Sequence, residues 1–309
     1  MVDNFLMISK QVLVLFILIA IGFLCGRKKL ITESSAKHIN DIVLYVVTPC
    51  VMISAFQREF SLQLLSNLGI MLICSALVII ISIFIVHLVF RSKDETEAKV
   101  LRFATVFSNC GFMSLPLQKA ILGEEGMFYG AVFVAVFNIT VWTYGLVSMS
   151  GDKKMLSLKK LIFNPGLVGV TVAFLLFIFN IKLPYIVIEP VGYLSSLNTP
   201  IPMLIIGYYL SEADLKKAFT KASAYICMGL RLLVIPVTTA VIMSFAGIDS
   251  TVVVACVIAS SAPTAATTTM FSAKFGRDVK LSVSIVAAST VLSIITMPPV
   301  IAFAQTLSG

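Results

Sequence analysis

The stretch FSNCGFMSLP at residues 107–116 decides how this chain folds, together with ASSAPTAATTT at residues 259–269. Each lies inside a long apolar run and concentrates polar and helix-breaking residues near its middle. Proline cannot donate a backbone N–H, and its ring clashes with the preceding helical turn. Ser114 and Ser261, each two positions before a proline, resemble the capping residues of a new helix. Each run is therefore predicted to break and restart near its middle.

The composition around these stretches is that of a polytopic membrane protein. The chain has 309 residues, of which 59% are hydrophobic and 12% are charged, whereas soluble domains average about 45–50% and about 25%. So few charges cannot cover that much apolar surface in water, and so much apolar surface excludes disorder. The net charge of +8 is spread over short basic clusters between apolar runs, which does not indicate a nucleic-acid partner. The six cysteines lie in apolar runs without a CxxC pair, so no metal site is expected.

The apolar runs set the number of membrane spans. A bilayer core of about 30 Å needs about 20 apolar residues per helix. Charged or turn-rich breaks divide the chain into ten such runs, and the predicted fold class is an all-α polytopic membrane protein with ten transmembrane helices. The predicted spans are 5–26, 38–56, 65–90, 101–122, 127–150, 165–181, 186–210, 222–246, 251–271 and 281–307.

The positive charges predict the orientation of these spans. Of the 23 lysine and arginine residues, eighteen lie in the loops after spans 1, 3, 5, 7 and 9, four lie on the other side, and Arg231 lies inside span 8. Short cytoplasmic loops retain positive charge. We therefore expect a multi-pass protein of the cell membrane, embedded in the lipid bilayer, with both termini extracytoplasmic.

The spans also predict an internal repeat. Residues 1–150 hold five spans, residues 151–163 form a cytoplasmic linker, and residues 164–309 hold five more. Because five is odd, the second half enters the membrane from the opposite side, as in many secondary transporters. The Thr-Pro pair at residues 48–49 in span 2 is echoed at residues 199–200 in span 7. The sequence therefore favours a 5+5 inverted repeat in which spans 4 and 9 correspond.

Breaks in spans 4 and 9 predict a particular kind of site. Irregular backbone is tolerated at membrane depth only where it is buried in protein or lines a cavity. A restarted half-helix directs unpaired N–H groups and the positive end of its dipole toward the break. Two opposed breaks therefore predict a polar cavity that attracts anions. The alternative is that the prolines and small residues only kink the helices or allow close packing.

Six short strings carry a resemblance to a known family. They are NCGFMSLPL at 109–117, FNITVWTYG at 137–145, NP at 164–165, LP at 183–184, IG at 206–207 and APTA at 262–265. In this order and spacing the chain resembles the auxin efflux carrier family, including its bacterial members, over essentially all ten spans. The long hydrophilic central loop of the plant carriers is absent, so the chain resembles the compact bacterial type.

The resemblance implies a fold and a function. It implies that spans 4 and 9 cross, as in the bile-acid symporter and sodium/proton antiporter folds. It implies a transport domain of spans 3–5 and 8–10 and a scaffold of spans 1, 2, 6 and 7 that forms a homodimer. Family members move small organic anions: auxin in plants, and dicarboxylates such as malate or malonate in some bacteria.

The candidate substrate-binding residues lie at or near the two breaks. Asn109 can donate and accept hydrogen bonds, and it lies with Gly111 and Pro116 at the first break, whereas Pro263 and Thr264 lie at the second. For Asn109 the alternative is an interhelical hydrogen bond. For the threonine it is packing or a bond to its own helix.

Two further candidates lie in other spans. Asn138 in span 5 could complete the cavity or cap the broken backbone of span 4. Arg231 lies about 15 Å deep in span 8 at 1.5 Å per residue, and a buried cation there should face a cavity or a partner. It could be the counter-charge for a carboxylate, or it could extend to the cytoplasmic headgroups.

Missing features narrow the function. No Asp or Glu lies at the middle of a predicted span, as a carrier coupled to protons through a carboxylate would need. There is no phosphate-binding loop of an ATPase and no hydrolase motif. We therefore expect a secondary carrier for a small organic anion, not an enzyme, without cofactor or metal. The alternatives are a sodium-coupled symporter of the bile-acid type, a channel, or a membrane sensor or enzyme that does not transport its ligand.

Overall fold

A computed structural model of the chain describes residues 2–91, 95–213 and 221–309, and within these ranges the regular elements are all helices. Lys93, Lys216 and Lys217, which the count of cytoplasmic charges includes, lie outside the described residues. Six helical stretches are long and apolar enough to cross a membrane: Phe5–Arg27, Glu33–Phe56, Leu62–Val89, Cys110–Ser150, Ala222–Phe245 and Val279–Ser308. Two shorter apolar helices are Pro165–Ile178 and Ser250–Ser261. This is the helix content of a polytopic membrane protein.

The elements of the first half, in chain order, are α1 (Val2–Arg27), α2 (Glu33–Ile42), η1 (Val43–Val47), α3 (Thr48–Phe56), α4 (Leu62–Val89), α5 (Glu95–Val106), η2 (Cys110–Ser114), α6 (Leu115–Thr140), η3 (Val141–Gly145) and α7 (Leu146–Ser150). Those of the second half are η4 (Lys153–Met155), α8 (Leu158–Ile162), α9 (Pro165–Ile178), α10 (Tyr185–Ser196), α11 (Pro200–Glu212), α13 (Ala222–Gly229), η5 (Leu230–Val234), α14 (Ile235–Phe245), α15 (Ser250–Ser261), α16 (Thr267–Lys274) and α17 (Val279–Ser308).

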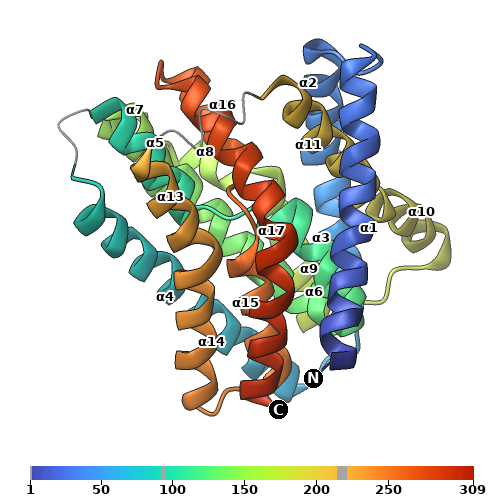
Figure 1. The fold of residues 1–309 in the computed structure, drawn as a ribbon. Helices are drawn as coiled ribbons and strands as arrows, with labels where there is room; N and C mark the ends of the chain where they lie inside the picture. Colours follow the sequence, from blue (N-terminus) through green and yellow to red (C-terminus); the bar gives the residue numbers. More distant parts are fainter. Residues whose placement is uncertain (1, 92–94, 214–220) are drawn as a thin grey trace.

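Each predicted span overlaps helix in the structure. Spans 101–122 and 251–271 are interrupted at residues 107–109 and 262–266, and two predicted boundaries differ. The boundary predicted between spans 4 and 5 is a kink inside α6 at Gly123, whose φ of 68° favours glycine. The predicted span 186–210 is two helices, α10 and α11, separated by residues 197–199. Both chain termini lie at the same end of the bundle (Figure 1). The count of ten spans and the inverted repeat stay predictions.

Wide helical turns precede three prolines. The π-helical segments η1, η2 and η5 are followed directly by helices with Pro49, Pro116 and Pro236 in their first turn. A proline in a continuing helix removes one hydrogen bond and crowds the carbonyl four residues back. A π turn pairs residues five apart, as where the Thr48 N–H bonds to the Val43 carbonyl, so the helix continues past the proline. The turn η5 carries Arg231.

The helices form two groups that also contact each other, α1 against α17 and both α3 and α9 against α6. In one group α1 packs along α11, and α3 packs on α9 and α10. Gly22 and Gly207 let α1 and α11 touch, because a Cβ at either position would overlap the backbone of the other helix. In the other group α15 is central: every residue from Val252 to Ser261 is buried, and α4, α6, α14 and α17 surround it. The candidate site lies within this second group, at the end of α15.

Candidate functional site

The chain leaves helical geometry within both polar stretches, residues 107–116 and 259–269. The first break lies between the end of α5 at Val106 and the start of η2 at Cys110. The second lies between the end of α15 at Ser261 and the start of α16 at Thr267. These four half-helices meet in one place, because the two irregular segments lie side by side.

The two irregular segments pair like a minimal antiparallel sheet. Ser108 and Thr264 form an isolated antiparallel bridge. The Asn109 N–H donates to the Pro263 carbonyl at 2.7 Å, and the Ala265 N–H donates to the Phe107 carbonyl at 2.9 Å. This pairing satisfies backbone groups that a broken helix would otherwise leave without partners in an apolar medium. We call this paired region, residues 107–109 with 262–266, the crossing.

The serine caps expected from the sequence are not formed, and this part of the prediction is wrong. Ser114 makes no capping hydrogen bond, and its hydroxyl is buried without a partner in the described part of the chain. The Ser261 hydroxyl donates back to the Ile258 carbonyl within α15. The first half-helix restarts earlier, at Cys110, so half-buried Pro116 lies within the restarted helix and Pro263 lies in the break itself. Backbone pairing between the two segments, rather than serine capping, satisfies the hydrogen-bonding groups of the crossing.

Thr264 holds the crossing together. Its hydroxyl donates to the Ala104 carbonyl on α5 at 3.1 Å, and its N–H donates to the Ser289 hydroxyl on α17 at 3.2 Å. The side chain is only 1% exposed. In this conformation its donor is therefore used within the protein, and contact with a substrate stays a prediction.

Arg231 binds the carbonyl ends of both broken helices. Its Nη1 donates to the carbonyls of Thr105 and Val106 at the end of α5, both at 3.0 Å. Its Nη2 donates to the Ser260 carbonyl at the end of α15. The side chain is 2% exposed, so the guanidinium does not reach the headgroups. A direct contact with a substrate carboxylate stays a prediction.

Asn109 is the candidate whose side chain is free to bind. The residue is 6% exposed, and its backbone N–H is used in the crossing. Among the described residues, its carboxamide has no hydrogen-bond partner. The amide nitrogen of a carboxamide has two donors that can bind a carboxylate. This carboxamide is therefore available at the crossing to an external partner.

Space and a second carboxamide lie next to it. A Cβ built at Gly111 would meet nothing within 4 Å. The Gly111 carbonyl accepts a hydrogen bond from Asn198 Nδ2 at 3.3 Å. Asn198 lies in the short link between α10 and α11 and is 5% exposed. Sequence reasoning missed Asn198, although it directly precedes the Thr-Pro pair that marks the repeat in span 7.

Asn138 lies elsewhere. Its Nδ2 donates to the Val134 carbonyl of its own helix at 3.0 Å. A Cβ at Gly166 on α9 would come within 2.8 Å of the same nitrogen, so this side chain lies at the contact of α6 with α9. None of its recorded contacts reaches the crossing, and its role in the site stays a prediction.

The electrostatics of the crossing favour an anion. The N-terminal turns of η2 and α16 carry partial positive charge. In α16 the N–H groups of Thr268 and Thr269 already donate to the carbonyls of Ala265 and Ala266. The negative C-terminal ends of α5 and α15 are bound by the full positive charge of Arg231. The ionisable side chains interacting with that arginine are the thiols of Cys110 and Cys227, and the crossing segments contain no acidic residue. The positive helix ends are therefore left without a compensating charge.

No metal centre accompanies this site. Within the described ranges, no group of three or more His, Cys, Asp and Glu side chains lies close enough to hold an ion. The six cysteines are free thiols.

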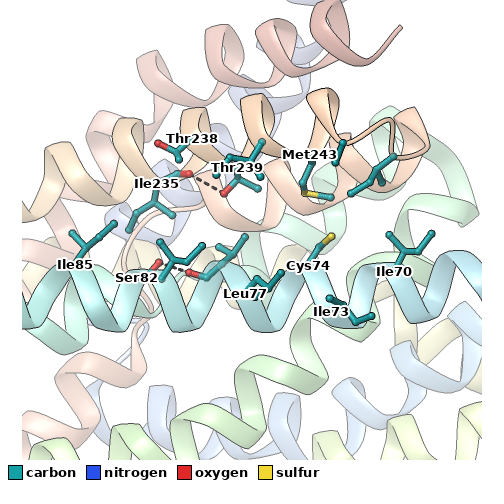
Figure 2. A pocket seen from close by; sticks show the side chains of 15 residues that line it. Ile70, Ile73, Cys74, Leu77, Ser82, Ile85, Ile235, Thr238, Thr239 and Met243 are labelled. Atoms are coloured by element: carbon teal, nitrogen blue, oxygen red, sulfur yellow. Dashed lines mark hydrogen bonds between the residues drawn. The ribbon is translucent and has the colours of Figure 1, made fainter.

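A groove lies outside the crossing. It has a volume of about 420 Å³ and lies between α4 and α14 (Figure 2). Its walls are mostly isoleucine, leucine and valine. The Ser82 hydroxyl donates to the Val78 carbonyl at 2.6 Å and the Thr239 hydroxyl to the Ile235 carbonyl at 2.8 Å, and a third hydroxyl, on Thr238, is exposed. The groove therefore offers an almost entirely apolar surface.

Comparison with known proteins identifies the family. A family model described as "Membrane transport protein" matches residues 7–301. The chain is 25% identical over 302 residues to an uncharacterized transporter of Methanocaldococcus jannaschii, covering 93% of this chain and 95% of that protein. It is 27% identical over 300 residues to an uncharacterized transporter of Methanothermobacter thermautotrophicus, covering 94% and 96%. The chain is thus a member of this membrane transport protein family, the auxin efflux carriers.

Proposed function

We propose that this membrane transporter is a secondary carrier for a small organic anion, such as an auxin-like monocarboxylate or a dicarboxylate of the malate or malonate type. The observation that carries the proposal is the crossing itself. There two helix N-termini and an unpartnered carboxamide lie near Gly111, where an added Cβ would meet nothing within 4 Å, and the opposing helix C-termini are already neutralised by Arg231. Such a site attracts a carboxylate and offers no acidic group to repel it.

The substrate carboxylate binds near Asn109, Gly111 and Thr264. The Asn109 carboxamide donates to one carboxylate oxygen, and N–H groups of the η2 first turn donate to the other. Pro263 keeps the second helix broken, whereas Pro116 lies in the first turn of α6, behind the η2 turn that faces the substrate. Arg231 favours the anion indirectly, because its guanidinium neutralises the negative carbonyl ends behind the crossing.

Alternating access follows from the two packing groups. The group around α15 corresponds to the transport domain of spans 3–5 and 8–10, and the group of α1, α3, α9, α10 and α11 corresponds to the scaffold of spans 1, 2, 6 and 7. Movement of the first group against the second would expose the crossing to either side in turn, as in carriers built from two inverted repeats. The scaffold would form the homodimer contact, and residues 151–163 would link the two halves.

The membrane potential supplies a direction. The protein is proposed to lie in the cell membrane with both termini outside. A potential of about 100 mV is worth about 2.3 kcal/mol per charge, which biases a monovalent anion outward by about fiftyfold.

Counterflow in proteoliposomes tests this function. The purified protein is reconstituted in liposomes loaded with an unlabelled carboxylate, and uptake of labelled carboxylates is measured across a panel of mono- and dicarboxylates. A carrier gives saturable uptake that an internal substrate accelerates. Conductance without saturation would indicate a channel, and binding without uptake would indicate a sensor; either result would contradict the proposal.

A further inference from the structure

The most deeply buried charge in the described part of the molecule lies where two helix ends meet. Arg231 is the largest of the fully buried side chains. Its guanidinium donates to three carbonyl oxygens that belong to two different broken helices. Among the described residues it has no carboxylate partner. A cation in such a place is costly unless its environment supplies compensating negative groups.

The compensating groups are the two helix C-termini. The last turn of a helix carries about half a negative charge on its unpaired carbonyls. The ends of α5 and α15 therefore supply together about one negative charge to one guanidinium. Three backbone carbonyls that converge from two helix ends also form the kind of oxygen cage that binds a small cation.

Cation-coupled carriers use such cages. In transporters with broken helices, unwound carbonyls and half-helix C-terminal ends coordinate the coupling ion. Here a side chain already fills that position. The guanidinium is always charged and cannot dissociate from the chain. A sodium ion would have to displace three charge-assisted hydrogen bonds to enter.

We infer that the Arg231 guanidinium is a resident cation that takes the position of a coupling ion at the crossing. The carbonyl ends are neutralised in every step of the cycle, so the carrier binds no sodium ion there. One consequence, that anion transport is independent of sodium, rests on the proposed transport function. The statement that no sodium ion binds at the Arg231 position does not depend on that function.

Thermal unfolding of the purified protein tests the binding statement. Wild type and Arg231→Ala are titrated separately with NaCl, KCl, guanidinium chloride and methylguanidinium chloride in the low millimolar range. We expect the melting temperature of wild type to respond to sodium and potassium alike. We expect guanidinium or methylguanidinium to raise the melting temperature of Arg231→Ala saturably, because either ion restores the lost donors.

A matched control separates this effect from general binding of guanidinium. Arg277 also donates to two backbone carbonyls, Met149 and Ser150, at the end of α7, but it is only half-buried. Water can replace the guanidinium there, so Arg277→Ala should not be rescued. Equal rescue of the two variants would overturn the inference.

Transport supplies a second readout. Counterflow by wild type should be unchanged when sodium is replaced by potassium. Arg231→Ala should lose at least about tenfold, since one hydrogen bond to a charged group is worth at least that factor. Methylguanidinium should restore part of the loss, and Arg231→Lys should retain more activity than alanine.

The outcomes are separable. A saturable stabilisation of wild type by sodium but not potassium would overturn the inference, and this measurement needs no variant that folds. If Arg231→Ala is recovered only when methylguanidinium is present during extraction, the inference is supported. If wild type transports no anion, the proposed function fails, whereas the unfolding titrations still decide the cation site.

Discussion

The groove between α4 and α14 is lined mostly by apolar side chains (Figure 2), whereas carbonyls, two carboxamides and one guanidinium lie at and beside the crossing. In the groove the hydroxyls of Ser82 and Thr239 bond within their own helices. At the crossing the Asn109 carboxamide has no partner among the described residues. The groove is thus almost entirely apolar, with one exposed hydroxyl on Thr238, whereas the crossing holds a carboxamide without a protein partner. Unsatisfied hydrogen-bonding groups, rather than volume, indicate where a polar solute binds in a membrane protein.

The physical reason is the medium around each region. An apolar ligand gains little binding free energy in such a groove, because the lipid chains it would displace are as apolar as the leucines and isoleucines of the walls. The Asn109 carboxamide, which has no partner among the described residues, gains a hydrogen bond from a substrate. Variants at the crossing and in the groove test this difference.

The largest effect is expected at Asn109. Asn109→Ala should lower counterflow by about tenfold or more, because a hydrogen bond to a carboxylate is worth about 1.5–3 kcal/mol. Its melting temperature should stay near that of wild type, since no protein partner loses a bond.

The companion variant is Asn138→Ala. Its amide bonds to its own helix, so we expect a smaller loss of transport than for Asn109→Ala. Equal losses for the two variants would place both asparagines in the substrate site. Unchanged kinetics for Asn109→Ala would remove that residue from it.

An intermediate effect is expected at Asn198. This side chain joins the α10–α11 link to the Gly111 carbonyl of the crossing by one neutral hydrogen bond of 3.3 Å. Such a bond is worth about 0.5–1.5 kcal/mol, so Asn198→Ala should change the counterflow rate about two- to tenfold. The change should appear mainly in the rate, because the bond links the two packing groups whose relative movement we propose for the transport cycle. An effect confined to the half-saturating substrate concentration would instead assign Asn198 to substrate binding.

The smallest effect is expected in the groove. Thr239→Val removes a hydroxyl that bonds only to the Ile235 carbonyl and keeps the side-chain shape. Transport should match wild type, and stability should change by no more than about 0.5 kcal/mol. Counterflow and thermal unfolding measure the two quantities. A severalfold loss of transport would show that the groove takes part in the cycle and would undo the contrast with the crossing.

Much of the architecture was predictable from local properties. Apolar runs and charged breaks placed every predicted span on helix, because membrane helices must satisfy their backbone internally. The prolines and polar residues near positions 109 and 263 correctly indicated that two helices break. The serine caps at Ser114 and Ser261 were predicted wrongly, because each break found a better partner in the other segment than in a hydroxyl.

That the chain is a membrane protein with two interrupted helices follows from its residues alone, since hydropathy and proline influence the backbone within a few residues of where they occur. What the two breaks contact depends on the tertiary structure. Arg231 is 125 residues from Val106, and Asn198 is 87 residues from Gly111. No local pattern reports which carbonyl a distant guanidinium or carboxamide will reach. That choice is made when the helices pack and each buried polar group must find a partner.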